Sequence, residues 1–297
     1  MRTPEARPAI RSRWLAAVGG ALALVLGSLA LALPASAATP LVFATFKGDA
    51  AADEELWIYQ STNGGTNYSV LADTNFRGPT GVLRDPSILK AGGTYYIAYT
   101  VQSWTTNSTY FNIASSTNLT SWTNIASVNS GIANTKYTWA PEFFVDGGVV
   151  KLIVSVAATT CSNCFRPYVY TARNAALTSW SGPAQMWGLG TNHIDTFVVK
   201  SGNTWHAFTK DETAKYIEHW TTTASLTSGW VNRGRLFSSG YEGPSVVRLD
   251  NGSWRMYVDK YSTGGAIYTA TSSDLNSWTG LSAVGCSGCR HGTAIPK

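Results

Sequence analysis

The chain has 297 residues, a formal net charge of +5 and only 13% charged residues. These charges are scattered, which argues against the basic stripe that a nucleic-acid backbone requires, so we expect no nucleic-acid partner. The length fits one large all-β domain or two ordinary domains.

The N-terminal segment, residues 1–37, has the three parts of a secretory signal peptide. Four Arg residues come first, followed by an apolar run from Trp14 to Leu33 and then the small residues Ala35-Ser36-Ala37. The run could span a bilayer as an uncleaved anchor, but the small residues directly after it favour cleavage. We therefore expect a secreted, extracellular protein with no membrane contact. Without the four Arg and one Glu of this segment, the net charge falls to +2.

Two sequence pieces recur along the rest of the chain. Residues 84–100, 140–156, 194–210 and 241–260 each contain an acidic residue, an apolar strand, a turn with Gly and a second strand. Each is followed by a second piece that ends in tryptophan: Trp122, Trp180, Trp230 and Trp278. A period of about 50 residues is typical of propeller blades.

A fifth unit is divided between the two ends of the chain. Residues 290–295 offer an innermost strand, and residues 41–46 and 55–62 offer outer strands. The sequence therefore predicts one all-β domain over 38–297, a five-bladed β-propeller with four antiparallel strands per blade. The N- and C-terminal strands would close its ring within one blade. An open β-sandwich of two unrelated halves would not explain the matching copies.

The first strand of each blade should line the central channel, and the residue at its start should lie near the axis. These residues are Asp85, Glu142, Asp195, Glu242 and, in the fifth unit, His291. A single acid could simply cap a turn, an interpretation that applies best to Glu142. A set of acids repel one another and lose hydration, which indicates a use for them. Glycoside hydrolysis needs one protonated and one ionised carboxyl group at the same place.

At these positions the chain resembles glycoside hydrolase family 43. The resemblance runs from LVFATF through LRDPSIL, TWAPEFF, HIDTFVV and YEGPSVV to RHGTAI. It implies an inverting enzyme in which Asp85 is the general base, Glu242 the general acid and Asp195 the residue that modulates the pKa of the acid. The chain departs from the family pattern at Thr196, where proline often follows the third acid. The resemblance favours an exo-acting α-L-arabinofuranosidase that acts on arabinan or arabinoxylan.

Further residues are candidates for substrate contact. Arg84 precedes the base, and Trp104 and Trp139 lie beside presumed catalytic strands, although each ring could equally pack at a blade edge. Glu142 and His193 are candidates for substrate contact or for structural roles. His291 could contact the acids or a hydrated structural ion in the channel. We expect no required cofactor and no certain metal ligand.

The four cysteines form two C-x-x-C pairs, Cys161/Cys164 and Cys286/Cys289. Two such pairs could bind one zinc ion, but an exported chain meets an oxidising compartment, which favours disulfides. The pairing stays open, because four cysteines allow three connectivities.

Other functions remain compatible with the sequence. A β-xylosidase or an endo-arabinanase would have the same fold, and a secreted propeller lectin would bind sugar without cleaving it. A lectin repeats one site in every blade, whereas these blades differ at the axial position, which favours a single catalytic site. A structural wall-associated protein is a weaker alternative. We expect a monomer whose partner is an arabinose- or xylose-containing plant polysaccharide or oligosaccharide.

Overall fold

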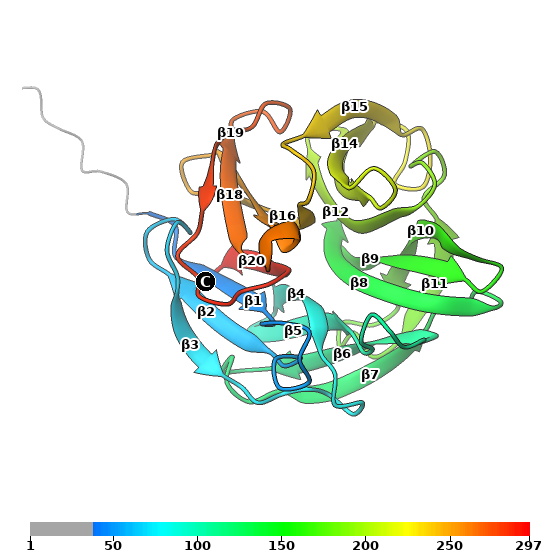
Figure 1. The fold of residues 1–297 in the computed structure, drawn as a ribbon, viewed down its shortest axis with the longest axis horizontal. Coiled ribbons are helices and arrows are strands. Elements are labelled where there is room, and N and C mark those ends of the chain that lie inside the picture. Colours follow the sequence, from blue (N-terminus) through cyan, green and yellow to red (C-terminus); the bar gives the residue numbers. More distant parts are fainter. Residues whose placement is uncertain (1–37) are drawn as a thin grey trace, which may run out of the picture. The chain divides into compact units, whose positions relative to one another are not determined.

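The computed structural model describes residues 38–297, apart from the side chains at positions 162 and 163. The predicted signal peptide, residues 1–37, lies outside the described residues. The described chain consists of twenty strands in five four-stranded antiparallel sheets arranged as a ring (Figure 1). The sequence prediction of a five-bladed propeller is confirmed.

Four blades each use consecutive strands, ordered from the axis outward. Blade I contains β4 (Arg84–Ala91), β5 (Thr94–Thr100), β6 (Tyr110–Ser116) and β7 (Thr123–Asn129). Blade II contains β8 (Thr135–Asp146), β9 (Val149–Ala158), β10 (Cys161–Ala172) and β11 (Trp180–Gln185). Blade III contains β12 (His193–Ser201), β13 (Thr204–Asp211), β14 (Tyr216–Thr222) and β15 (Val231–Leu236). Blade IV contains β16 (Glu242–Arg248), β17 (Trp254–Asp259), β18 (Ile267–Ser272) and β19 (Thr279–Ala283), with a short 3₁₀ helix, η1 (Tyr261–Thr263), between β17 and β18.

Blade V closes the ring with both ends of the described chain. Its strand order is β20 (Gly292–Pro296), β1 (Leu41–Thr45), β2 (Trp57–Ser61) and β3 (Ser69–Asp73). Leu41 pairs with Pro296 and Thr45 with Gly292, so the innermost strand comes from the C-terminal part and the other three from the N-terminal part. In Figure 1 the red strand β20 accordingly lies beside the blue strand β1.

The core consists of five apolar layers, each between two neighbouring blades. Between blades V and I, for example, Ile58 and Val42 pack with Ile88 and Tyr99. The other four clusters fill the remaining junctions in the same way. Within residues 38–297 no helix is long and apolar enough to cross a membrane.

The recurring tryptophans have a structural role. The indole N–H of Trp122, Trp180, Trp230 and Trp278 donates to a leucine carbonyl three or four residues earlier, at 2.9–3.2 Å. Each indole thereby closes the turn between the third and fourth strands of its blade. These rings satisfy their only polar group internally, as buried tryptophans usually do.

Each C-x-x-C motif forms its own disulfide, Cys161–Cys164 and Cys286–Cys289, with Cα atoms 5.3 and 5.6 Å apart. The prediction of disulfides is confirmed, and the open question of their pairing is resolved. The two bridges lie on different blades, so they constrain separate loops.

We expect the purified protein to contain no free thiol and no stoichiometric zinc, because both cysteine pairs are oxidised within their own motifs. Thiol titration after denaturation, together with metal analysis, measures this. Four reactive thiols with one equivalent of zinc would contradict it.

Candidate active site

A pocket of about 280 Å³ lies at the end of the channel where the innermost strands begin. All five blades contribute to its lining. Seven of the nine predicted catalytic and substrate residues line it: Arg84, Asp85, Trp104, Trp139, Asp195, Glu242 and His291. Glu142 and His193 are not among the described lining residues.

In blades I to IV a β-bulge at the start of the innermost strand sets the direction of the side chains at that end of the strand. At each bulge the pairing register shifts, and one residue has a left-handed backbone conformation: Asp85, Ala140, Asp195 and Gly243, with φ between 46° and 54°. Non-glycine residues rarely adopt this conformation, and it commonly marks functional positions. The bulge turns Asp85 and Asp195 toward the axis from equivalent positions.

This geometry corrects the alignment of Glu142 with Asp85. Measured from the bulge, Glu142 lies two residues further along its strand, level with Ser87 rather than Asp85. It is 1% exposed and accepts hydrogen bonds from His291 and Thr293, both at 3.3 Å. Burial raises the pKa of Glu142, against the lowering effect of the His291 contact. Glu142 thus lies beneath the pocket floor, where it supports His291.

His291 is the central cation of the site. Its Nε2 contacts Glu142, while its Nδ1 lies 3.4 Å from Asp85 Oδ1 and 3.9 Å from Asp195 Oδ2. Burial alone would lower the pKa of His291, but the charges of these three carboxyl groups and the hydrogen bond to Glu142 outweigh it and raise the pKa to about 10. An imidazolium here offsets part of the repulsion among the acids. The predicted contact with the acid cluster is present. Within the described residues no group of three or more candidate ligands is placed to hold a metal ion, and the hydrated ion stays a prediction.

Asp195 is held between its blade neighbours. Its backbone N–H donates to Ser155 Oγ of blade II at 3.1 Å, and its Oδ2 accepts from the N–H of Gly243 in blade IV at 3.0 Å. Burial, with the charge of Glu242, raises the pKa of Asp195 to about 7, although His291 and Lys210 act in the opposite direction. Its carboxyl group therefore contacts the residue directly after Glu242 in blade IV.

Asp85 has a different environment from Asp195. Its Oδ2 accepts a hydrogen bond from Thr100 Oγ1 at 2.9 Å, and its side chain is 17% exposed at the pocket surface. A hydrogen-bonded, partly exposed carboxyl group next to His291 is placed to accept a proton from a water molecule in the pocket.

Glu242 has two basic partners that the sequence interpretation missed. Lys210 Nζ lies 2.8 Å from its Oε2, and Arg290 donates to its Oε1 at 3.3 Å. Lys210 is 3% exposed, and the charges of Glu242, Asp195 and Glu212 raise its pKa despite burial. Both carboxylate oxygens of Glu242 are therefore engaged by cations in this structure.

A pattern in the repeats could have revealed Lys210. The residue near the end of the second strand, opposite the start of the first, is Thr100, Ser155, Lys210 or Asp259 in blades I to IV. In each case it contacts the next blade: Thr100 accepts from the N–H of Ala140, and Asp259 from the N–H of His291. These positions link neighbouring blades around the pocket.

Arg84 and the two tryptophans border the pocket. Arg84 forms ion pairs with Asp49 at 2.7 Å and Glu54 at 3.1 Å, so its guanidinium is fixed by carboxylates of blade V. Trp104 is 61% exposed at the rim, whereas Trp139 packs against Phe165 with ring centroids 4.8 Å apart. An exposed ring and a supported ring are both available for contact with a sugar.

The structure does not support substrate contact by His193. Its Nε2 contacts Glu218 Oε2 at 3.1 Å, and its ring meets Trp220 edge-on. Asp195 lies within the bulge between Ile194 and Phe197, so the regular alternation that would place the side chains of His193 and Asp195 on the same face does not hold there.

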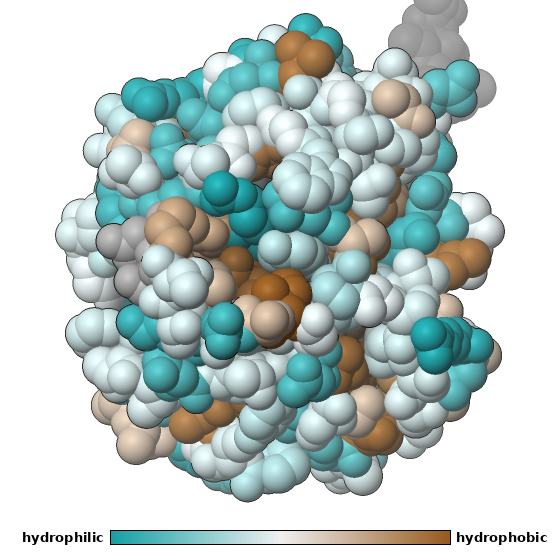
Figure 2. Space-filling model, turned by 90° about the vertical axis from the view of Figure 1, so that its right-hand side faces the viewer, coloured by the Kyte–Doolittle hydropathy of each residue, from teal (hydrophilic) through white to brown (hydrophobic). Residues whose placement is uncertain are grey.

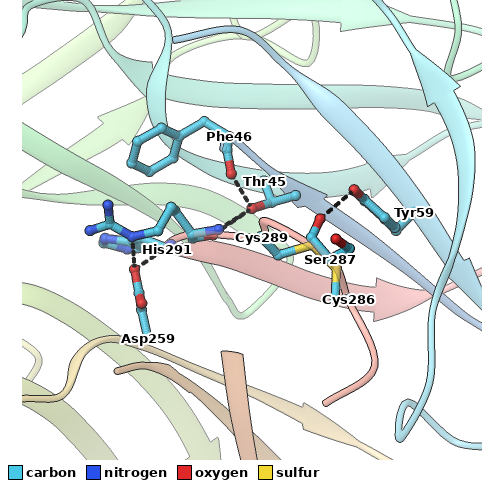
Figure 3. The surroundings of a disulfide bond; sticks show 9 residues. Thr45, Phe46, Tyr59, Asp259, Cys286, Ser287, Cys289 and His291 are labelled. Atoms are coloured by element: carbon cyan, nitrogen blue, oxygen red, sulfur yellow. Dashed lines mark hydrogen bonds and ion pairs between the residues drawn. A yellow bond between two sulfur atoms is a disulfide. The ribbon is translucent and has the colours of Figure 1, made fainter. Parts of the chain in front are cut away.

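One disulfide supports the pocket. Figure 3 shows the Cys286–Cys289 loop, in which the Tyr59 hydroxyl reaches the carbonyl of Ser287 at 3.1 Å. Arg290 follows directly and pairs with Asp259 Oδ2 at 2.7 Å, and the N–H of His291 donates to the same oxygen at 3.1 Å. The bridge thus fixes the backbone immediately before both residues. The Cys161–Cys164 bridge does not line this pocket and borders a different hollow.

We expect Lys210→Met to lower turnover, because Lys210 Nζ holds Glu242 Oε2 at 2.8 Å and a methionine side chain cannot form this contact. Steady-state kinetics measures this. Lys215→Met is the matched control, because Lys215 pairs with Glu212 and lacks the contact with Glu242. Equal turnover in Lys210→Met and the wild type would contradict the expectation.

A five-bladed propeller with carboxyl groups of contrasting environments around one axial pocket defines a glycoside hydrolase type of site. The chain belongs to the family related to glycoside hydrolase family 43: the family model described as a probable glycosyl hydrolase domain matches residues 38–297. The predicted resemblance is confirmed, and the membership supports glycosidase activity.

Solved structures show the same fold. An α-L-arabinanase from Cellvibrio cellulosa, complexed with arabinohexaose, is 14% identical with a TM-score of 0.57, covering 82% of this chain and 92% of that chain. An endo-arabinase from Bacteroides thetaiotaomicron is 15% identical with a TM-score of 0.55, covering 75% and 95%. An exo-β-1,3-galactanase from Clostridium thermocellum is 14% identical with a TM-score of 0.58, covering 71% and 51%. Comparison with curated proteins gives no match.

Proposed function

We propose that this protein is a secreted, monomeric, inverting glycoside hydrolase that releases L-arabinofuranose from arabinan or arabinoxylan without a required cofactor. The observation that carries the proposal is the meeting of Asp85, Asp195 and Glu242 in one axial pocket. At about 280 Å³ the pocket is slightly smaller than the ~300–1,000 Å³ typical of ligand sites, which suits a short sugar segment.

The roles follow from the environments of the three acids. Asp85, partly hydrated and beside His291, is the base that activates water. Glu242 delivers a proton to the leaving oxygen, and Asp195 supports it from the neighbouring blade. Lys210 and Arg290 hold the two carboxyl oxygens of Glu242 beside the pocket.

The choice of arabinofuranoside rests on the sequence motifs and directs the first assays. One structural neighbour is described as an α-L-arabinanase, one as an endo-arabinase and three as exo-β-1,3-galactanases. Incubation with aryl α-L-arabinofuranoside, aryl β-xyloside, linear arabinan, arabinoxylan and β-1,3-galactan, followed by identification of the released sugars, tests the proposal. Arabinose released from the first, third or fourth substrate supports it, whereas xylose or galactose alone would contradict the substrate.

We expect the first-formed sugar to have the anomeric configuration opposite to that of the substrate. Asp85 and Glu242 approach the axis from blades I and IV, which favours the ~6.5–9.5 Å carboxyl separation that leaves room for water in an inverting site. Proton NMR of the product during the first turnovers measures the outcome. Retention of configuration would contradict the roles given to these residues.

A further inference from the structure

A second hollow, of about 340 Å³, lies in the outer part of blade II. Its lining comes from β9, β10 and β11 and from the connections on either side of this blade. No described residue lines both this hollow and the axial pocket. Ala158 and Cys161 place it at the end of blade II where β8 begins, because Ala158 pairs with Thr135.

One face of the sheet forms the wall of this hollow. Tyr168 of β10 pairs with Gln185 of β11, and Arg166 lies two residues before Tyr168 on the same face. Trp187 follows Gln185 by two residues, just after β11 ends. The backbones of Arg166, Tyr168 and Gln185 are therefore held by strand pairing, and the N–H of Trp187 donates to the carbonyl of Thr227 at 2.9 Å.

Trp187 is 64% exposed, in contrast to Trp122 and Trp230, which are 9% and 6% exposed. Tryptophan is highly buried on average, and exposure of so large an apolar ring to water is unfavourable. Trp187 is not one of the tryptophans that close a turn, so the turn architecture does not account for it. An indole presented beside a hollow is suited to stack on the apolar face of a ring.

The polar groups beside Trp187 suit a neutral ligand with many hydroxyl groups. The Tyr168 hydroxyl and the Gln185 amide are 3.4 Å apart, and Arg166 Nη1 donates to the Phe165 carbonyl at 3.1 Å. The described lining residues include one basic side chain and no carboxylate. A single positive charge is too little for a polyphosphate backbone.

A protein or lipid partner is disfavoured by the surrounding surface. Figure 2, which views the molecule from the side of β10 and β11, shows apolar side chains in small areas separated by polar ones. Stable protein interfaces require a larger continuous surface. A sugar chain needs only a ring platform and a few hydrogen-bonding groups.

The Cys161–Cys164 disulfide supports this hollow, since both cysteines belong to its lining. Strand β10 also carries Phe165, which packs against Trp139 of the axial pocket. Strand β10 therefore lines this hollow and also supports a ring that lines the axial pocket.

We propose that the hollow beside Trp187 is a second carbohydrate site, which binds a stretch of the polysaccharide substrate outside the axial pocket. The identity of the polymer in this proposal rests on the proposed function. The second site would make the protein bind polymers more tightly than the axial pocket alone and would leave the hydrolysis of small substrates unchanged.

Affinity electrophoresis in gels that contain linear arabinan or arabinoxylan tests the site. We expect the wild-type protein to be retarded, Trp187→Ala to bind about tenfold more weakly, and Trp187→Phe to keep most of the retardation, because a phenyl ring can still stack. Gln185→Ala should weaken binding in the same direction. Hydrolysis of aryl α-L-arabinofuranoside should be unchanged in all three variants, which also shows that they are folded. Val231→Ala, an exposed apolar residue of β15, is the surface control.

Two outcomes would overturn the site: no retardation of the wild-type protein by either polymer, or equal retardation of Trp187→Ala and the wild type. Retardation that is lost in Trp104→Ala but kept in Trp187→Ala would assign binding to the axial pocket and would also overturn it. Retardation that depends on Trp187, in a protein that hydrolyses no substrate, would support the site and contradict the proposed function instead.

Discussion

Asp85→Asn and Glu242→Gln are each expected to reduce kcat by about 10²–10⁴-fold, the range for loss of a general base or acid. Both amides keep the size of the original side chain. The amide oxygen introduced by Asp85→Asn could still accept a hydrogen bond from Thr100, and the amide introduced by Glu242→Gln could still lie beside Lys210, so folding should be intact. Steady-state kinetics on the best substrate measures the loss, and circular dichroism checks the fold.

Asp49→Asn is the matched control for these variants. Asp49 is a carboxylate near the pocket that pairs with Arg84 and is 53% exposed, so its removal should change turnover little. If either catalytic variant kept more than about a tenth of the wild-type rate, the role assigned to the substituted residue would be wrong. Recovery of activity with azide would argue against inversion, since it indicates that azide attacks the covalent glycosyl-enzyme intermediate of a retaining enzyme.

His291→Gln should lower the free energy of unfolding by about 3–5 kcal/mol near neutral pH, because it removes the cation that three buried or partly buried carboxyl groups face. Since the pKa of His291 is raised to about 10 in the folded state, its stabilisation is complete below its unfolded pKa of about 6.5. It is then lost as the pH rises through about 10. Urea unfolding of both proteins between pH 6 and pH 10 measures this dependence.

The pH dependence distinguishes this effect from ordinary loss of packing. The stability difference between the wild type and His291→Gln should shrink toward alkaline pH. His206→Gln is the matched control, because His206 is a buried histidine whose pKa is lowered by burial and which is neutral over this range. Its cost should not vary between pH 7 and pH 10. A constant difference for His291→Gln as well would contradict a charged His291.

The blades and the divided fifth unit could be predicted because each repeat contains the whole information for its own strands. An apolar strand, a Gly turn and a second strand recur in each copy, and the packing of each blade against its two neighbours arranges the blades in a ring. The axial position of Asp85, Asp195, Glu242 and His291 follows from the start of the innermost strand in each copy, although Glu242 lies one residue before the position of Asp85 when the strands are aligned at their bulges. These residues were found because the ring brings the starts of these strands together.

The bulges limited the prediction of the site. A register shift of one or two residues is invisible in the hydrophobic pattern, so Glu142 was placed level with Asp85 and His193 was placed in the pocket. Lys210 was missed for a different reason. Its importance comes from a contact between blades III and IV, and a repeat read by itself contains no information about its neighbour.

The axial site is complete only when blade V has closed the ring. Arg290 and His291 immediately precede β20, the last strand, which pairs with β1 near the other end of the described chain. Four blades could form and pack in order while the central cation was still absent and the acids faced one another without it. We therefore expect a chain shortened by these few residues to lack glycosidase activity even where most of its blades are intact, because the axial pocket would then lack His291.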